Sequence, residues 1–256
     1  MSRLYKYYTL RTGKVVSAPT PPSGEPVGDR SISFPGTSGV FAATAVNASS
    51  VINTSTNTGW YRLWFYRLNG SPTAFRDCLL GCTNTGWSGG FAAGNTNVAN
   101  QLRVWLHAWN SANIINFTLP AIGSWNHLVV TFQDGNVLKA KLNGGAVQSV
   151  ACGTGTIPSS VMRLGSSQLT VNSGEFRGYQ NNYGFGNTLL SDADMNALYN
   201  GGVPINALDV VPGATQLFSI TQADTVTAAG GIADTGSLAT PANGNASLSL
   251  STEVPS

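Results

Sequence analysis

Charged residues are scarce in this sequence: Asp, Glu, Lys and Arg make up 9% of its 256 residues, whereas a typical soluble domain has about 25%. This scarcity excludes a coiled coil with charged flanks, a thermophile-type ion-pair surface and a highly charged disordered chain. With two histidines and eleven acidic residues, the chain has few groups for acid–base or metal chemistry. No apolar run approaches the roughly 20 residues of a membrane span.

Cysteine is also rare, with one residue at each of positions 78, 82 and 152. Met1–Lys14 lacks the apolar region of a secretory signal, so we expect the protein to be made in a cytoplasm. An odd cysteine count in such a chain argues against a disulfide framework, although a local Cys78–Cys82 pair stays open. A zinc site would need more ligands, and His107 and His127 lie far away in strand-like segments. We expect buried thiols, no metal and no other cofactor.

Acidic residues are missing altogether from the first 14 residues, which carry four basic ones. The next segment, Val15–Arg30, has four prolines and predicts an extended spacer, although Pro-rich segments are also ligands of aromatic grooves. We therefore divide the chain into residues 1–30, a basic aromatic arm with its linker, and residues 31–256, the folded domain. The residues expected to dock the arm on a partner are Arg3, Leu4, Tyr5, Lys6, Tyr7, Tyr8, Leu10 and Arg11. A disordered tail is the alternative.

From residue 31 onward, short apolar runs separated by Gly, Asn, Pro and Ser predict an all-β domain. Leu102–Trp109 alternates as a strand does. Trp60–Leu68 is bulky on both faces and predicts a central strand covered on both sides. His127–Gln133, Val137–Leu142 and Ala146–Val150 are joined by Asp-Gly and Asn-Gly turns, which predicts a three-stranded meander. In this meander we expect Leu128, Val130 and Phe132 in the core and Lys139 and Lys141 facing away from it.

One short helix is expected outside the β body, over Asp192–Asn200. Ser191 is a good N-cap, and Asp194 three residues later completes a short capping box. The apolar stripe of the helix consists of Met195, Leu198 and Tyr199. The pair Gly201-Gly202 is expected to end the helix.

Six short motifs follow one another in a characteristic order. They are Ser31–Gly36 (SISFPG), Trp125–Phe132 (WNHLVVTF), Leu138–Gly144 (LKAKLNG), Met162–Gly165 (MRLG), Glu175–Gly178 (EFRG) and the helix segment Leu190–Gly202. In this order they resemble the laminin-G-like branch of the concanavalin A-like lectin/glucanase superfamily, of the kind found in bacteriophage virion proteins. The resemblance implies a jelly-roll sandwich of two antiparallel sheets. It leaves function open, because this fold supports lectins, glycanases, adhesion modules and virion proteins.

The sequence lacks the paired catalytic carboxylates of the relatives that are glycanases. Relatives that cleave glucans carry a Glu-x-Asp-x-x-Glu run on one strand, and no such run occurs here. A glycosidase needs two carboxyl groups about 5–10 Å apart, but the three glutamates are scattered at positions 25, 175 and 253. The helix start accounts for Asp192 and Asp194. We expect no catalytic residues, no enzyme activity, and two histidines that are packed rather than reactive.

One strand face stands out as a candidate for binding. Arg103, Trp105, His107 and Trp109 face away from the apolar side of Leu102–Trp109; we call these four residues the predicted face. Trp and Arg dominate protein interface hot spots, and aromatic rings also stack on sugars. Three interpretations stay open: a cover of loops or of the C-terminal segment, a protein interface, and a glycan site.

These features predict a non-enzymatic virion structural protein, a phage head decoration or tail surface protein. It would attach through its arm and display a lectin-like domain on the virion surface. The expected partners are a major capsid or tail protein and further copies of this chain. Nucleic acid is not expected, because four cations without a basic body bind polyanions weakly, and neither is a membrane. The alternative is a carbohydrate-binding or adhesion module that recognises cell-surface glycans.

Overall fold

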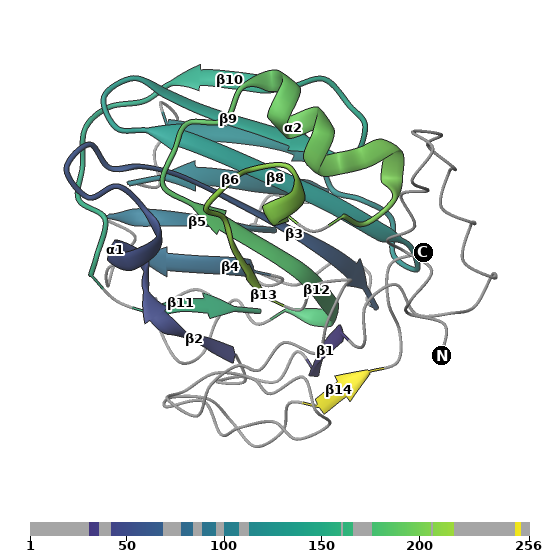
Figure 1. Ribbon diagram of the computed structural model, residues 1–256. Coiled ribbons are helices and arrows are strands. Elements are labelled where there is room, and N and C mark those ends of the chain that lie inside the picture. The colour runs from purple at the N-terminus through teal and green to yellow at the C-terminus, as the bar shows by residue number, and fades with distance from the viewer. Residues whose placement is uncertain are drawn as a thin grey trace, which may run out of the picture.

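The computed structural model describes residues 31–35, 42–68, 78–83, 89–95, 100–107, 113–159, 161–165, 176–205, 207–217 and 249–251. The predicted arm and linker, residues 1–30, lie outside this part of the chain. Within it, two β-sheets lie face to face, and one helix covers the outer side of the larger sheet (Figure 1).

The larger sheet has eight strands and carries the candidate site. Its order is β10-β9-β8-β3-β12-β1-β14, and β13 pairs with β12. In chain order its strands are β1 (Ser31–Pro35), β3 (Thr58–Arg67), β8 (Trp125–Gln133), β9 (Val137–Leu142), β10 (Gln148–Ala151), β12 (Arg177–Gly186), β13 (Thr215–Leu217) and β14 (Ser249–Ser251).

The smaller sheet has six strands in the order β2-β11-β4-β5-β6-β7. They are β2 (Ala42–Asn47), β4 (Cys78–Thr83), β5 (Gly90–Asn95), β6 (Gln101–Leu106), β7 (Ile114–Thr118) and β11 (Val161–Leu164). The helical segments are α1 (Ala48–Val51), α2 (Asp192–Tyr199) and two short 3-10 turns, η3 (Asn200–Gly202) and η4 (Ala207–Asp209). Each pairing of described strands is antiparallel. The predicted all-β jelly-roll sandwich is confirmed.

Strand β3 shows how the sequence builds the two faces of the larger sheet. Tyr61 and Phe65 belong to the core between the sheets. Trp60, which points the opposite way because side chains alternate along a strand, packs under the helix instead. Both sets are buried, so the predicted central strand covered on both sides is confirmed except at Tyr66, which is partly exposed.

Helix α2 forms where the capping pattern predicts it. The Ser191 side chain accepts from the Asp194 backbone N–H, and the Asp194 carboxylate accepts from the Ser191 N–H, so both halves of the capping box are present. Met195 and Leu198 are buried against the larger sheet. The helix ends at Asn200, which adopts the left-handed conformation with φ of 49°. The predicted stop at the glycine pair was thus one residue late, because Asn also tolerates this conformation.

The meander of β8, β9 and β10 is confirmed, with Leu128, Val130 and Phe132 in the core. The two lysines of β9 face away from that core, as predicted, but α2 covers them. Lys139 Nζ lies 2.7 Å from the Asp192 carboxylate, and Lys141 donates to the Asn196 side chain. A neighbouring helix, which sequence alternation does not reveal, thus buries Lys141 to 6% exposure.

Strand β6 is shorter than predicted. Leu102, Val104 and Leu106 lie in the core as expected, but the strand stops at Leu106. His107 has a φ of 63°, which takes the chain out of the extended conformation. Trp109 lies outside the described residues.

Candidate functional site

A pocket of about 560 Å³ opens on the outer side of the larger sheet, beside the end of α2. We call it the aromatic pocket; it is lined by Trp64, Tyr66, Gly123, Ser124, Trp125, Asn143, Tyr199 and Gly202. Four of these eight residues are aromatic and none carries a charge. Such a lining suits a ligand that has apolar faces and uncharged polar groups.

Three elements supply the aromatic rings. Trp64 and Tyr66 are alternate residues of β3 and therefore project to the same side. Trp125, the first residue of β8, is the Cα partner of Tyr66, and their ring centroids are 5.7 Å apart. Tyr199, the last residue of α2, stacks on Trp64 with ring centroids 6.4 Å apart and planes 19° apart.

A chain of amide hydrogen bonds fixes the polar wall of the pocket. Asn143 Nδ2 donates to Asn126 Oδ1 over 2.9 Å, and Asn126 Nδ2 donates to the Ser124 carbonyl oxygen over 2.9 Å. Asn143 Oδ1 in turn accepts from the His127 backbone N–H at 2.8 Å. The loop at Ser124 and the turn at Asn143 are therefore held to β8. Preformed walls of this kind reduce the entropy that a ligand loses on binding.

His127 packs against two of these rings without lining the pocket itself. It is fully buried, and its ring centroid lies 5.0 Å from that of Trp64 and 5.8 Å from that of Tyr199. Burial, followed by the nearby charges of Arg62 and Lys141, holds the pKa of His127 well below its ordinary value of 6.5. The imidazole is therefore neutral at physiological pH, and both of its nitrogens lack a hydrogen-bond partner. The prediction that His127 is packed is confirmed.

Arg62 connects the end of the helix to the sheet. It is fully buried on β3, and its guanidinium donates to the Leu198 carbonyl at 3.3 Å, to Asn182 Oδ1 at 2.9 Å and to the Ile205 carbonyl. Burial lowers the pKa of Arg62 to about 9, against a smaller opposing effect of Asp209, so the group is charged at neutral pH. Its hydrogen bonds hold the segment that supplies Tyr199 and Gly202 to the pocket.

The predicted face is placed differently from this pocket. Trp105, 1% exposed, is buried beside Cys78 and Ala92. His107 is also buried, as the packed-histidine prediction had it. Arg103 is partly exposed and donates to Asn116 Oδ1 at 2.9 Å. Within the described residues this face therefore does not present its tryptophan to solvent, and its role in binding stays a prediction.

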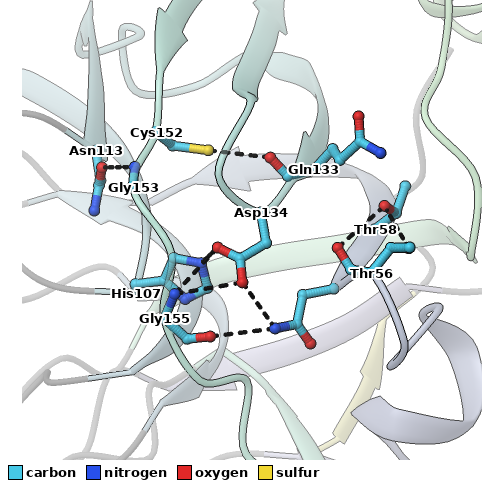
Figure 2. Close-up of polar contacts among 10 residues, drawn as sticks. Thr56, Thr58, His107, Asn113, Gln133, Asp134, Cys152, Gly153 and Gly155 are labelled. Carbon is cyan, nitrogen blue, oxygen red and sulfur yellow. Dashed lines mark hydrogen bonds and ion pairs between the residues drawn. The ribbon is translucent and has the colours of Figure 1, made fainter.

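A second polar cluster surrounds His107 and Asp134 (Figure 2). His107 Nε2 lies 2.8 Å from Asp134 Oδ1, and the same carboxylate accepts from Asn57 Nδ2 and from the Gly155 backbone N–H. Burial alone would raise the pKa of Asp134, but these hydrogen bonds and the neighbouring histidine lower it below 3.8. The cluster ties together the end of β6, the β8–β9 turn and the segment after β10.

This cluster braces the fold and is not arranged as a nucleophilic site. The thiol of Cys152 points away from His107 (Figure 2) and donates to the Gln133 carbonyl at 3.2 Å. Burial raises the pKa of this thiol, whereas a reactive cysteine needs a lowered one. All three cysteines are buried thiols outside any disulfide, so Cys78 and Cys82 are not bonded to each other.

The brace can be tested with two neighbouring glycines. A Cβ at Gly155 would overlap the His107 imidazole and lie 2.6 Å from its Nδ1, whereas a Cβ at Gly153 would meet nothing within 4 Å. We expect Gly155→Ala to lower the free energy of unfolding by about 1–3 kcal/mol, the usual cost of overpacking. Gly153→Ala, the matched control, should leave it nearly unchanged. Urea denaturation measures both, and equal stabilities would show that His107 does not press on this segment.

Two further findings concern metal binding and membrane-spanning helices in the described part of the chain. No three His, Cys, Asp or Glu side chains there form a group that could hold a metal ion. Likewise, none of the described helices has the length and apolar character needed to cross a bilayer.

No protein-family model matches the sequence, and no curated protein matches it either. Solved structures do. A heptameric SAP-like pentraxin from Limulus polyphemus is 14% identical, with 76% of this chain and 97% of the pentraxin chain covered and a TM-score of 0.51. The CBM40 domain of the Ruminococcus gnavus IT-sialidase, bound to α2,3-sialyllactose, is 15% identical over 56% of this chain and 83% of that one, with a TM-score of 0.44. The binding domain of botulinum neurotoxin DC, in complex with SialylT, is 18% identical over 58% of this chain and 36% of that one, with a TM-score of 0.43. At 14% identity the likeness to the pentraxin is one of fold, and it agrees with a concanavalin A-like sandwich.

Proposed function

We propose that this chain is a non-enzymatic glycan-binding module and that the aromatic pocket is its binding site. The observation that carries the proposal is the pocket lining itself, which combines four aromatic rings with Ser124 and Asn143 and has no charged residue. Aromatic rings cover the C–H faces of a sugar, while hydroxyl and amide groups bind its hydroxyls. A jelly-roll sandwich is also an architecture on which lectin domains are built.

The same lining argues against hydrolysis at this site. Acid–base cleavage of a glycosidic bond needs two carboxyl groups that flank it, and the eight lining residues supply none. The pocket is thus suited to holding a sugar.

Removing one ring from the pocket tests the proposal. We expect Trp125→Ala to weaken glycan binding at least about 10-fold, a loss of ~1.4 kcal/mol, because this partly exposed residue lines the pocket and contributes contact area. Screening on a glycan array followed by titration calorimetry measures the effect. Leu189→Ala is the control: this residue is exposed and lies next to Leu190, whose backbone N–H bonds Thr131 at the far end of β8. A wild-type protein that retains no glycan, or a Trp125→Ala variant that binds as well as wild type, would contradict the proposal.

We further propose that this module is displayed on a virion, attached through residues 1–30. The sequence supports this proposal, because four cations and several aromatic side chains occur together in the first 14 residues. An extended segment of this kind is able to add to the exposed sheet edge of a partner. Protein that starts at Ser31 should then fail to occupy particles lacking the full-length protein, while its melting temperature shifts by only a few degrees. Equal occupancy of the particles by both forms would refute attachment through the arm.

A further inference from the structure

The aromatic pocket continues into a row of rings that crosses three neighbouring strands. Trp125 of β8 is the Cα partner of Tyr66 of β3, which is the Cα partner of Tyr179 of β12. Residues that face each other in this way project to the same side of a sheet. The ring centroids are 5.7 Å apart between Trp125 and Tyr66 and 5.6 Å apart between Tyr66 and Tyr179. We call these three residues the aromatic row.

The row extends beyond the pocket by one strand. Trp125 and Tyr66 line the pocket, whereas Tyr179 does not. All three side chains are partly exposed, so the third ring offers contact area that a ligand confined to the pocket would leave unused. A ligand that covers all three must reach from β8 across β3 to β12.

The tilts of the rings describe the shape of that ligand. The planes of Tyr66 and Trp125 are 60° apart, and those of Tyr66 and Tyr179 are 43° apart. A flat platform, which would fit the even face of a packed polysaccharide, needs nearly coplanar rings. Tilted rings instead offer separate surfaces to successive units of a soluble chain.

Charge restricts the unit that enters the pocket. An acidic sugar there would bury a carboxylate without a cationic lining residue, which is costly. The cations beneath the pocket already have partners: Arg62 donates to the Leu198 carbonyl and Lys141 to Asn196. Arg177 is exposed two residues before Tyr179, so a positive charge stands near the outer end of the row rather than in the pocket.

We infer that the binding site is extended, with a neutral sugar unit in the pocket and the next unit on Tyr179. The ligand is then an oligosaccharide that lies across β8, β3 and β12. This inference rests on the proposed glycan-binding function and adds its substrate class and one specificity-determining residue.

The test uses neutral mono-, di-, tri- and tetrasaccharides on an array, together with the same glycans capped by a terminal sialic acid. Wild-type protein should bind at least one neutral oligosaccharide series 10-fold or more tightly than its monosaccharide. Tyr179→Ala should reduce oligosaccharide affinity to the monosaccharide level and lower monosaccharide affinity far less, since Tyr179 does not line the pocket. Tyr179→Leu should show the same loss of oligosaccharide affinity. Because leucine keeps apolar volume at the position, this variant separates the loss of the ring from a folding defect. Leu189→Ala serves as the unaffected control.

The possible outcomes separate this inference from the function on which it rests. Equal wild-type affinity for monosaccharides and oligosaccharides overturns the extended site but leaves the pocket as a glycan site. A preference for sialylated glycans over their neutral counterparts overturns the assignment of a neutral unit to the pocket. Retention of no glycan at all overturns the proposed function and this inference together.

Discussion

Replacing Arg62 with methionine should lower the free energy of unfolding by about 3 kcal/mol, because methionine deprives buried hydrogen-bond acceptors of a charged donor. The guanidinium donates to the Leu198 carbonyl and to Asn182 Oδ1, and also to the Ile205 carbonyl, which keeps Asn182 Nδ2 as a second donor. Each acceptor that loses its donor in the interior costs about 1–3 kcal/mol. Methionine matches the length and apolar character of the stem, so the loss reports the hydrogen bonds rather than a cavity.

Lys139→Met provides the matched control for this variant. Lys139 also connects the sheet to α2, through the Asp192 carboxylate, but its side chain is 26% exposed and that of Asp192 is 59% exposed. Exposed ion pairs contribute about 0–1 kcal/mol, so the control should lose little stability. Urea denaturation of the two variants measures the difference, and similar losses in both would show that Arg62 does not fasten the helix. Glycan affinity should fall in Arg62→Met alone, since Tyr199 and Gly202 belong to the segment that Arg62 holds.

The local features of this fold were predictable from sequence because their signals are local. The turn after β8 lies at Asp134-Gly135 and the turn after β9 at Asn143-Gly144, where the dipeptides predict them. Gly135 and Asn143 indeed have positive φ values of 66° and 51°. The capping box of α2 is likewise contained within four residues. Alternation along β8 assigned its core residues correctly, since a strand with one face in a core keeps a period of two.

The aromatic pocket was not predicted, because it depends on strand register. Trp125, Tyr66 and Tyr179 are brought together only by the pairing of three strands that are distant in sequence. The aromatic run of β3 predicts a strand covered on both sides and does not by itself indicate a pocket. That interpretation holds for Trp60 under α2, whereas the helix ends at Tyr199 and leaves Tyr66 partly exposed. The length of a covering helix decides which part of a sheet face becomes a site, and no pattern within β3 records it.

At the predicted face, alternation separates the two sides of the strand correctly but leaves exposure open, and a covered face is one of its three interpretations. Trp105 does project away from the core between the sheets, yet it is buried on the other side of the smaller sheet. A strand pattern separates two faces without stating whether the second one meets solvent. The strand pattern also does not show the strand end at His107, where the residue has a left-handed conformation and its ring lies against Asp134 and Gly155.

Mild acid should destabilise this protein through His127, and His127→Phe should remove most of that effect. Burial, then the charges of Arg62 on β3 and Lys141 on β9, keep the pKa of the folded imidazole well below 6.5. The unfolded chain takes up a proton near pH 6.5, so between the two pKa values the unfolded state binds more protons. The free energy of unfolding must therefore fall as the pH drops below about 6.5, by up to ~1.4 kcal/mol per pH unit. Phenylalanine loses no hydrogen bond at this position, since neither ring nitrogen has a partner.

Asp134 also confers acid sensitivity, but in a lower pH window. Its pKa is depressed below 3.8 in the folded protein, so its stabilising contribution is present above that pH and is lost only as the pH falls further. Urea denaturation at intervals from pH 7.5 to about 4.5 therefore reports His127, and Lys139→Met, which leaves both histidines and Asp134 in place, serves as the control that keeps the wild-type slope in this range. Glycan affinity should decline over the same interval, because the imidazole lies against Trp64 and Tyr199. Parallel stability profiles for wild type and His127→Phe would show that the buried imidazole does not govern the response.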